Sequence, residues 1–103
     1  MRMMVTFSFD AEGGNDAVIS GKVQEIFGKL MEDLKPEAVY AYAVGGQRGG
    51  HMIINMNDSS EVATVAERFW LGLKAHVEMT PVMNGDDLQK GLSGIDAIAK
   101  RFT

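Results

Sequence analysis

The stretch AVYAYAVGGQRGGHMIINMN, residues 38–57, decides the fold that we predict. Over residues 38–44 small apolar side chains alternate with larger ones, including Tyr40 and Tyr42, and a period of two is typical of a β-strand. A second strand is predicted over residues 51–57. The segment between them holds four glycines, which tolerate the positive φ angles of tight turns. We therefore predict two antiparallel strands joined by a hairpin.

Two more strands flank this hairpin in the sequence. Residues 2–9 alternate between apolar and more polar side chains, as do residues 76–82. Pro81 has no amide donor, so the strand that contains it is predicted to lie at a sheet edge.

Helical spacing of apolar residues fills the intervals between the strands. The first predicted helix is capped by Asn15 or Asp16 and ends before Pro36. The second follows residues 58–61, which have the spacing of a capping box. After a turn at residues 84–85, a third, terminal helix is outlined by an apolar stripe of Leu88, Leu92, Ile95, Ala99 and Phe102.

Composition excludes several classes of function. The 103 residues carry a net charge of −4 with basic residues scattered among acids, so no surface is expected to follow a nucleic-acid backbone. Cysteine is absent, which removes disulfides and thiolate chemistry and is typical of a reducing compartment. The apolar stretch near the N-terminus is short and alternating, so neither a signal peptide nor a membrane span is expected. We expect a cytoplasmic protein without nucleic-acid or membrane partners.

The order of elements predicts one α+β domain over residues 1–103. Two strand-helix-strand units with right-handed crossovers are satisfied by a ferredoxin-like βαββαβ fold, a four-stranded antiparallel sheet of order 4-1-3-2 plus the C-terminal helix. The crossover helices then cover the more apolar face of the sheet, made of Met3, Val5, Phe7, Val39, Ala41, Met52, Ile54, Met56, Val77 and Met79. The opposite face, called the bare face below, shows Met4, Thr6, Ser8, Tyr40, Tyr42, His51, Ile53, Asn55, His76, Glu78 and Thr80.

The bare face is too aromatic to be left open to water. Met4, Ile53 and two tyrosines on one flat surface make a patch that usually marks an interface. We therefore expect the chain to form a homodimer through this face.

Three segments carry a resemblance to a known superfamily: MRMMVTFSF (residues 1–9), VGGQRGG (44–50) and FWLGLKAHVEMTPV (69–82). Together with the element order they resemble the dimeric α+β barrel superfamily, and within it a group of small uncharacterised bacterial proteins. The resemblance covers nearly the whole chain and implies a dimeric barrel. Members of that superfamily include monooxygenases, isomerases, decarboxylases, peroxidases and ligand-binding regulators, so it implies no single activity.

The strand order brings polar side chains to one end of the bare face. His76, Ser8, His51 and Tyr42 are predicted to form a row of roughly 14 Å, short enough for one small ligand, with Thr6, Tyr40 and Glu78 in a second row beneath. Histidine moves protons near neutral pH while tyrosine and serine orient polar groups, so His51, His76 and Tyr42 are the candidate catalytic residues. The alternative is that the same side chains bond across the dimer interface.

The remaining candidates have weaker patterns. Arg48 beside the glycine-rich hairpin is compatible with phosphate binding, but the spacing is not that of a P-loop and turn geometry explains the glycines. Trp70 is placed to wall a pocket or to pack, and Asn55 adds a polar group to the bare face. His51, His76 and Glu78 lack the close spacing of a metal site, so no metal is predicted. Haem-degrading members of the superfamily combine an asparagine, a tryptophan and a histidine; Ser8 at the comparable end of the first strand and His76 on a strand depart from that pattern, and no cofactor is expected.

Two functional hypotheses follow. The first is a dimeric module whose polar barrel interior binds a small molecule or simply closes the dimer. The second is a cofactor-independent enzyme, monooxygenase-like or isomerase-like, that acts on a small aromatic or carbonyl compound.

Overall fold

The computed structural model describes residues 1–103 and shows an α+β fold around one antiparallel sheet, which confirms the predicted class. No helix combines the length and the apolar composition needed to cross a membrane. The elements in chain order are β1 (Arg2–Phe9), α1 (Ala11–Ile19), α2 (Lys22–Leu34), β2 (Ala38–Val44), β3 (Gln47–Asn55), α3 (Glu61–Leu73), β4 (His76–Pro81), α4 (Gly85–Gly91), the 3-10 turn η1 (Leu92–Gly94) and α5 (Ile95–Phe102).

The four strands lie in the order β2-β3-β1-β4, which is 4-1-3-2 when read from the β4 edge. Every neighbouring pair is antiparallel. In the centre of the sheet Thr6 stands opposite His51 on one side and opposite Glu78 on the other. β4 lies at the edge of the sheet, so the missing amide hydrogen of Pro81 does not cost the sheet a backbone hydrogen bond between strands.

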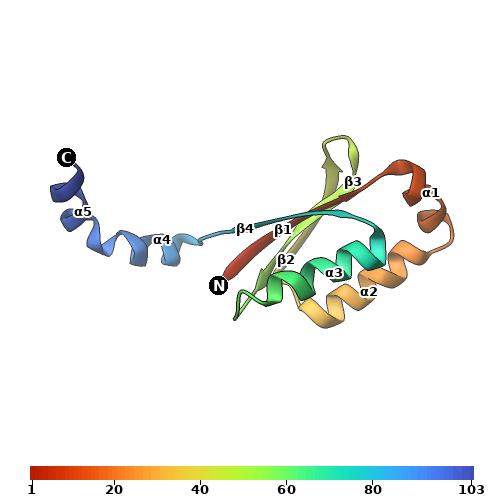
Figure 1. The fold of residues 1–103 in the computed structure, drawn as a ribbon, viewed down its shortest axis with the longest axis horizontal. Coiled ribbons are helices and arrows are strands. Elements are labelled where there is room, and N and C mark those ends of the chain that lie inside the picture. Colours follow the sequence, from red (N-terminus) through yellow and green to blue (C-terminus); the bar gives the residue numbers. More distant parts are fainter.

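The core lies between the sheet and the helices α2 and α3, which run along one face of it (Figure 1). Phe7 is at its centre, with its ring centroid 5.4 Å from that of Phe27 and 5.2 Å from that of Phe69. The buried cluster consists of Met3, Val5, Phe7, Phe9, Leu30, Met52, Ile54, Met56, Val65, Phe69, Leu73 and Ala75. Because burying one such large side chain contributes about 1.5–3 kcal/mol, this layer is the main source of stability.

β2 lies outside the cover of these helices. Val39 is paired with Met52 and so faces the helix side, as predicted, yet Val39 is 38% exposed and Ala41 is exposed too. The prediction that helices cover both residues is wrong, because the buried cluster draws on β1 and β3 and takes no residue from β2. The β2 edge therefore has two open faces.

The first predicted helix is divided in two and begins earlier than predicted. α1 starts directly after Asp10, so Gly13 and Gly14 lie inside a helix instead of preceding one. Gly14 packs closely on β1, since a Cβ there would lie 2.8 Å from Cδ2 of Phe9. The chain then turns at Gly21, whose φ of 83° separates α1 from α2.

Residues 85–103, called the C-terminal arm below, leave the domain instead of packing on it (Figure 1). Every residue from 88 to 103 is exposed. The Cα radius of gyration is 17.1 Å, whereas a compact domain of this length has about 13 Å. The predicted terminal helix is present, but η1 at residues 92–94 interrupts it.

Candidate functional site

The register of the sheet sets the rows of the bare face. Ser8 stands opposite His76 of β4 and opposite Gly49 of β3, and Gly49 stands opposite Tyr42 of β2. The row at this end of the sheet is therefore His76, Ser8, Gly49 and Tyr42. Because Gly49 has no side chain, the row is open between Ser8 and Tyr42.

His51 lies in the next row instead of the predicted one. It stands opposite Thr6 and Tyr40, and Thr6 stands opposite Glu78. The prediction assumed that β3 begins at His51, but β3 begins at Gln47 after a two-residue turn at Gly45 and Gly46. The shift is by two residues, so His51 keeps its face and changes its position along the strand.

Tyr40, His51 and Tyr42 form a compact cluster on the bare face. The centroid of the His51 ring lies 5.4 Å from that of each tyrosine ring, and the Nδ1 atom of His51 lies 3.4 Å from the Tyr42 hydroxyl oxygen. Tyr40 is 61% exposed and Tyr42 46%. The cluster thus offers an imidazole and two hydroxyls for hydrogen bonding beside exposed aromatic rings.

His76 stands apart from this cluster. Its Nε2 atom lies 3.6 Å from Oδ1 of Asp10, and the same oxygen accepts a hydrogen bond of 2.8 Å from Nε2 of Gln47. Both His76 and Asp10 are largely exposed, so this pair contributes little to stability. Two strand spacings and a step of two residues separate His51 from His76 by about 12 Å between backbone positions. A direct proton transfer between the two histidines is therefore excluded in one chain.

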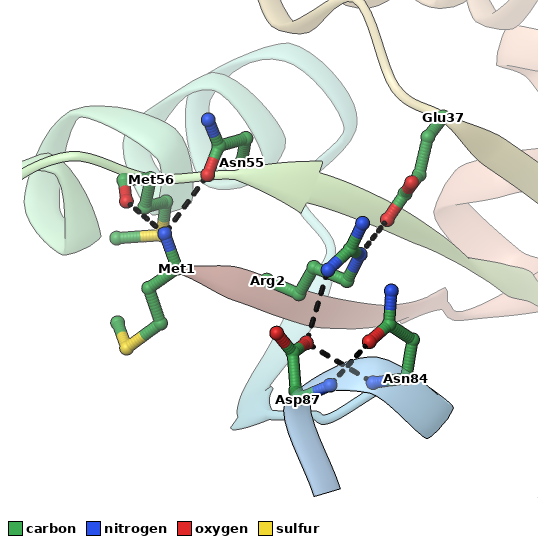
Figure 2. A network of polar contacts seen from close by, with 7 residues as sticks. All are labelled: Met1, Arg2, Glu37, Asn55, Met56, Asn84 and Asp87. Atoms are coloured by element: carbon green, nitrogen blue, oxygen red, sulfur yellow. Dashed lines mark hydrogen bonds and ion pairs between the residues drawn. The ribbon is translucent and has the colours of Figure 1, made fainter. Parts of the chain in front are cut away.

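Three other predicted residues lie away from the cluster. Arg48 points to the helix side, where its Nη1 donates to Oδ1 of Asn15 at 2.8 Å. Trp70 is on α3, which packs on the helix side, and is 48% exposed. Asn55 accepts a hydrogen bond of 2.9 Å from the amino group of Met1 (Figure 2). Ser8, Thr6 and Glu78 remain on the bare face with the cluster.

The surface hollows do not coincide with the histidines. One of about 480 Å³ follows the β2–β3 hairpin and is lined by Tyr42, Arg48 and Gly49 among others. Another of about 280 Å³ lies where β1 meets α1, and its lining includes Phe9 and Asp10. Neither is lined by His51 or His76, and no three side chains of the kinds that bind metals gather at one point. The bare face of one chain is an open surface.

A polar network that we did not predict ties the C-terminal arm to β1 (Figure 2). Arg2 donates from Nε to Oε1 of Glu37 at 2.8 Å and from Nη1 to Oδ2 of Asp87 at 3.0 Å. Asp87 and Asn84 form a full capping box: the Asp87 amide donates to Oδ1 of Asn84 at 2.8 Å, and the Asn84 amide donates to Oδ2 of Asp87 at 3.1 Å. The spacing of Asn84 and Asp87 was the available signal in the sequence.

The charges and hydrogen bonds of this network shift the pKa values of Asp87 and Arg2 in the directions that favour the charged form of each group. The hydrogen bond from the Asn84 amide, supported by Arg2, holds the pKa of Asp87 below its ordinary value. Glu37, and to a lesser degree Asp87, raise the pKa of Arg2. Arg2 alternates with Met3 and so shares the bare face with Met4 and Thr6. The arm is therefore anchored on the bare-face side of the sheet.

Comparison with known proteins identifies a family. Residues 1–95 match the family model described as a domain of unknown function, DUF3303. No curated protein and no solved structure matches the chain.

Proposed function

The chain belongs to the DUF3303 family, and because that description names no activity, we propose a function from the geometry of the bare face. In this proposal the protein is a homodimer of the dimeric α+β barrel type, in which two ferredoxin-like domains meet through their bare faces. The space between the two sheets binds a small molecule. The observation that carries this proposal is the exposure of Tyr40 and Tyr42 around His51 on the face without helices.

The apolar side chains of the bare face support dimerisation. Met4 and Ile53 lie side by side across β1 and β3, in the row next to Thr6 and His51. Both side chains are already half-buried in one chain, so moving their remaining exposed area into an interface contributes less than the about 1.5–3 kcal/mol of full burial for each. A second copy related by a two-fold axis offers the same apolar and aromatic side chains, so the bare face of each copy can cover that of the other.

The polar part of the bare face supports ligand binding. Stacked sheets pack about 10 Å apart, a distance that full-sized side chains must fill. The gap left by Gly49 lies between Ser8 and Tyr42 and one row from His51, so side chains do not fill it from this chain. Aromatic rings beside an imidazole and hydroxyls suit a small aromatic compound with a carbonyl or hydroxyl group.

One contact favours the enzyme hypothesis as a second candidate. The Nδ1 atom of His51 and the Tyr42 hydroxyl lie 3.4 Å apart, so the imidazole can take a proton from a bound molecule while tyrosine orients it. His76 takes part in such a reaction only if the dimer or the ligand spans the separation between the histidines.

Native mass spectrometry of the full chain purified from its own host tests the proposal. We expect the mass of a dimer with a retained small molecule. Ile53→Asp places a charge in the bare face and should give a monomer, whereas Leu71→Asp, on an α3 residue that is 81% exposed, should leave the dimer intact. A wild-type monomer at high concentration would contradict the homodimer. A ligand recovered unchanged after incubation favours binding, and one that is converted favours catalysis.

A further inference from the structure

The C-terminal arm has an apolar side that nothing in the chain covers. Leu88, Leu92, Ile95, Ile98 and Phe102 are between 46% and 76% exposed. α4 and α5 have seven and eight residues, and isolated helices shorter than about 12–15 residues are marginal in water. The arm therefore needs an external surface to be stable as a helix.

Its own domain does not supply that surface. Beyond the bond between Arg2 and Asp87 and the capping box that Asp87 forms with the adjoining Asn84, no side-chain hydrogen bond or ion pair links the arm to the rest of the chain. The arm extends along the longest dimension of the molecule, 59 Å against 27 Å and 21 Å for the others (Figure 1). The capping box and the Arg2 contact fix its root in this direction (Figure 2).

The root of the arm adjoins the proposed interface. Arg2 is on the bare face, and its guanidinium holds Asp87 at the beginning of α4. A second copy that covers the bare face must therefore pass close to the point where the arm leaves the sheet.

The arm adds to the area that the bare face offers to a partner. Four strands and six residues of each make a face of roughly 20 by 20 Å, or about 400 Å² in projection. A stable interface buries about 800 Å² of accessible surface per partner, a measure that exceeds the projected area of the same face because it follows the side-chain contours. The helical segments within residues 88–102 together extend over about 22 Å and are about 10 Å wide, which adds roughly 220 Å² in projection.

We propose that the apolar side of the C-terminal arm packs on a second copy of the chain, beside the bare face, and supplies a share of the dimer interface. This inference rests on the proposed homodimer. The two copies exchange arms reciprocally, so each arm becomes ordered as a helix when the dimer forms.

Two variants within α5 test the arm while leaving the domain unchanged. Ile95→Asp places a carboxylate on the apolar stripe, and Ala97→Asp places the same group about 160° away on the opposite side of the helix, given a turn of 3.6 residues. Sedimentation equilibrium of the full chain measures the dimer dissociation constant. We expect Ile95→Asp to raise it at least about tenfold and Ala97→Asp to leave it nearly unchanged. The far-ultraviolet helical signal per residue should fall when the wild type is diluted below its dissociation constant.

The outcomes separate this inference from the homodimer itself. If Ile95→Asp dimerises like the wild type while Ile53→Asp is monomeric, the sheet-face dimer stands and the arm contact is wrong. Equal weakening by both α5 variants would also overturn it, because the side of the helix would then be irrelevant. A tetramer that Ile95→Asp converts to a dimer would place the arm between dimers and not beside the bare face. A wild-type monomer would remove both proposals.

Discussion

Gly49 and Gly50 of β3 lie where the backbones of the neighbouring strands leave no room for a side chain. A Cβ at Gly49 would lie 2.1 Å from the carbonyl oxygen of Phe7, and a Cβ at Gly50 would lie 2.1 Å from that of Tyr40. These oxygens belong to backbone on both sides of β3, so the neighbours cannot move without disturbing the ladder. The two glycines thus hold β3 against β1 and β2, and Gly49 also leaves the opening beside Ser8 and Tyr42.

Alanine substitutions at Gly50 and Gly28 should therefore have opposite effects. Gly50→Ala forces β2 and β3 apart and should lower the free energy of unfolding by about 1–3 kcal/mol. Gly28→Ala lies in the interior of α2 with nothing near the added methyl group, and should raise it by about 0.5–1 kcal/mol. Urea denaturation of both variants at one protein concentration measures the two changes. A Gly50→Ala variant as stable as the wild type would show that β3 accommodates a side chain there.

At the scale of elements, periodicity predicted the sheet and the helix side, and turn length caused the main error. The alternation over residues 2–9 is present in β1 as a strict sequence of half-buried and buried residues. Residues 47–50 lack such a signal because Gly49 and Gly50 have no side chains to alternate. We therefore predicted that the strand begins at His51, which misplaced His51 by two residues along β3. The start of α1 was missed because Gly13 and Gly14 are poor helix formers and so indicate a break, whereas in the structure both lie inside the helix that follows Asp10.

The beginning of α4 makes a prediction about pH. The pKa of Asp87 is lower in the folded chain than in the unfolded chain, so its carboxylate stabilises the root of the arm fully above about pH 4, the ordinary value, and this contribution is lost as the pH falls through the lowered folded value. Carbon-13 NMR titration of the Asp87 carboxyl group measures the shift. Arg2→Gln should raise the pKa of Asp87 partway, because the larger cause, the hydrogen bond from the Asn84 amide, remains. A full return to the ordinary value would make Arg2 the main cause.

At the scale of the whole molecule, the chain has a covered half and an open half. Helices cover β1 and β3 on one side, whereas β2, the bare face and the C-terminal arm are open to solvent. The apolar stripe of the arm was evident in the sequence, but periodicity shows only that a helix has an apolar side and not what covers it. A second copy on the bare face would cover both that face and the arm beside it, which is why we favour a second copy over separate partners for the two.

If folding and dimerisation are coupled in this way, thermal stability must depend on protein concentration. Each tenfold rise in concentration favours the dimer by about 1.4 kcal/mol, which corresponds to several degrees in Tm for a domain of this size. We expect the wild-type Tm to rise steadily from low to high micromolar concentration in differential scanning calorimetry. The Tm of the monomeric Ile53→Asp variant should stay constant over the same range, because its unfolding involves no change in the number of molecules. A wild-type Tm independent of concentration would mean that the open half is stable without a partner.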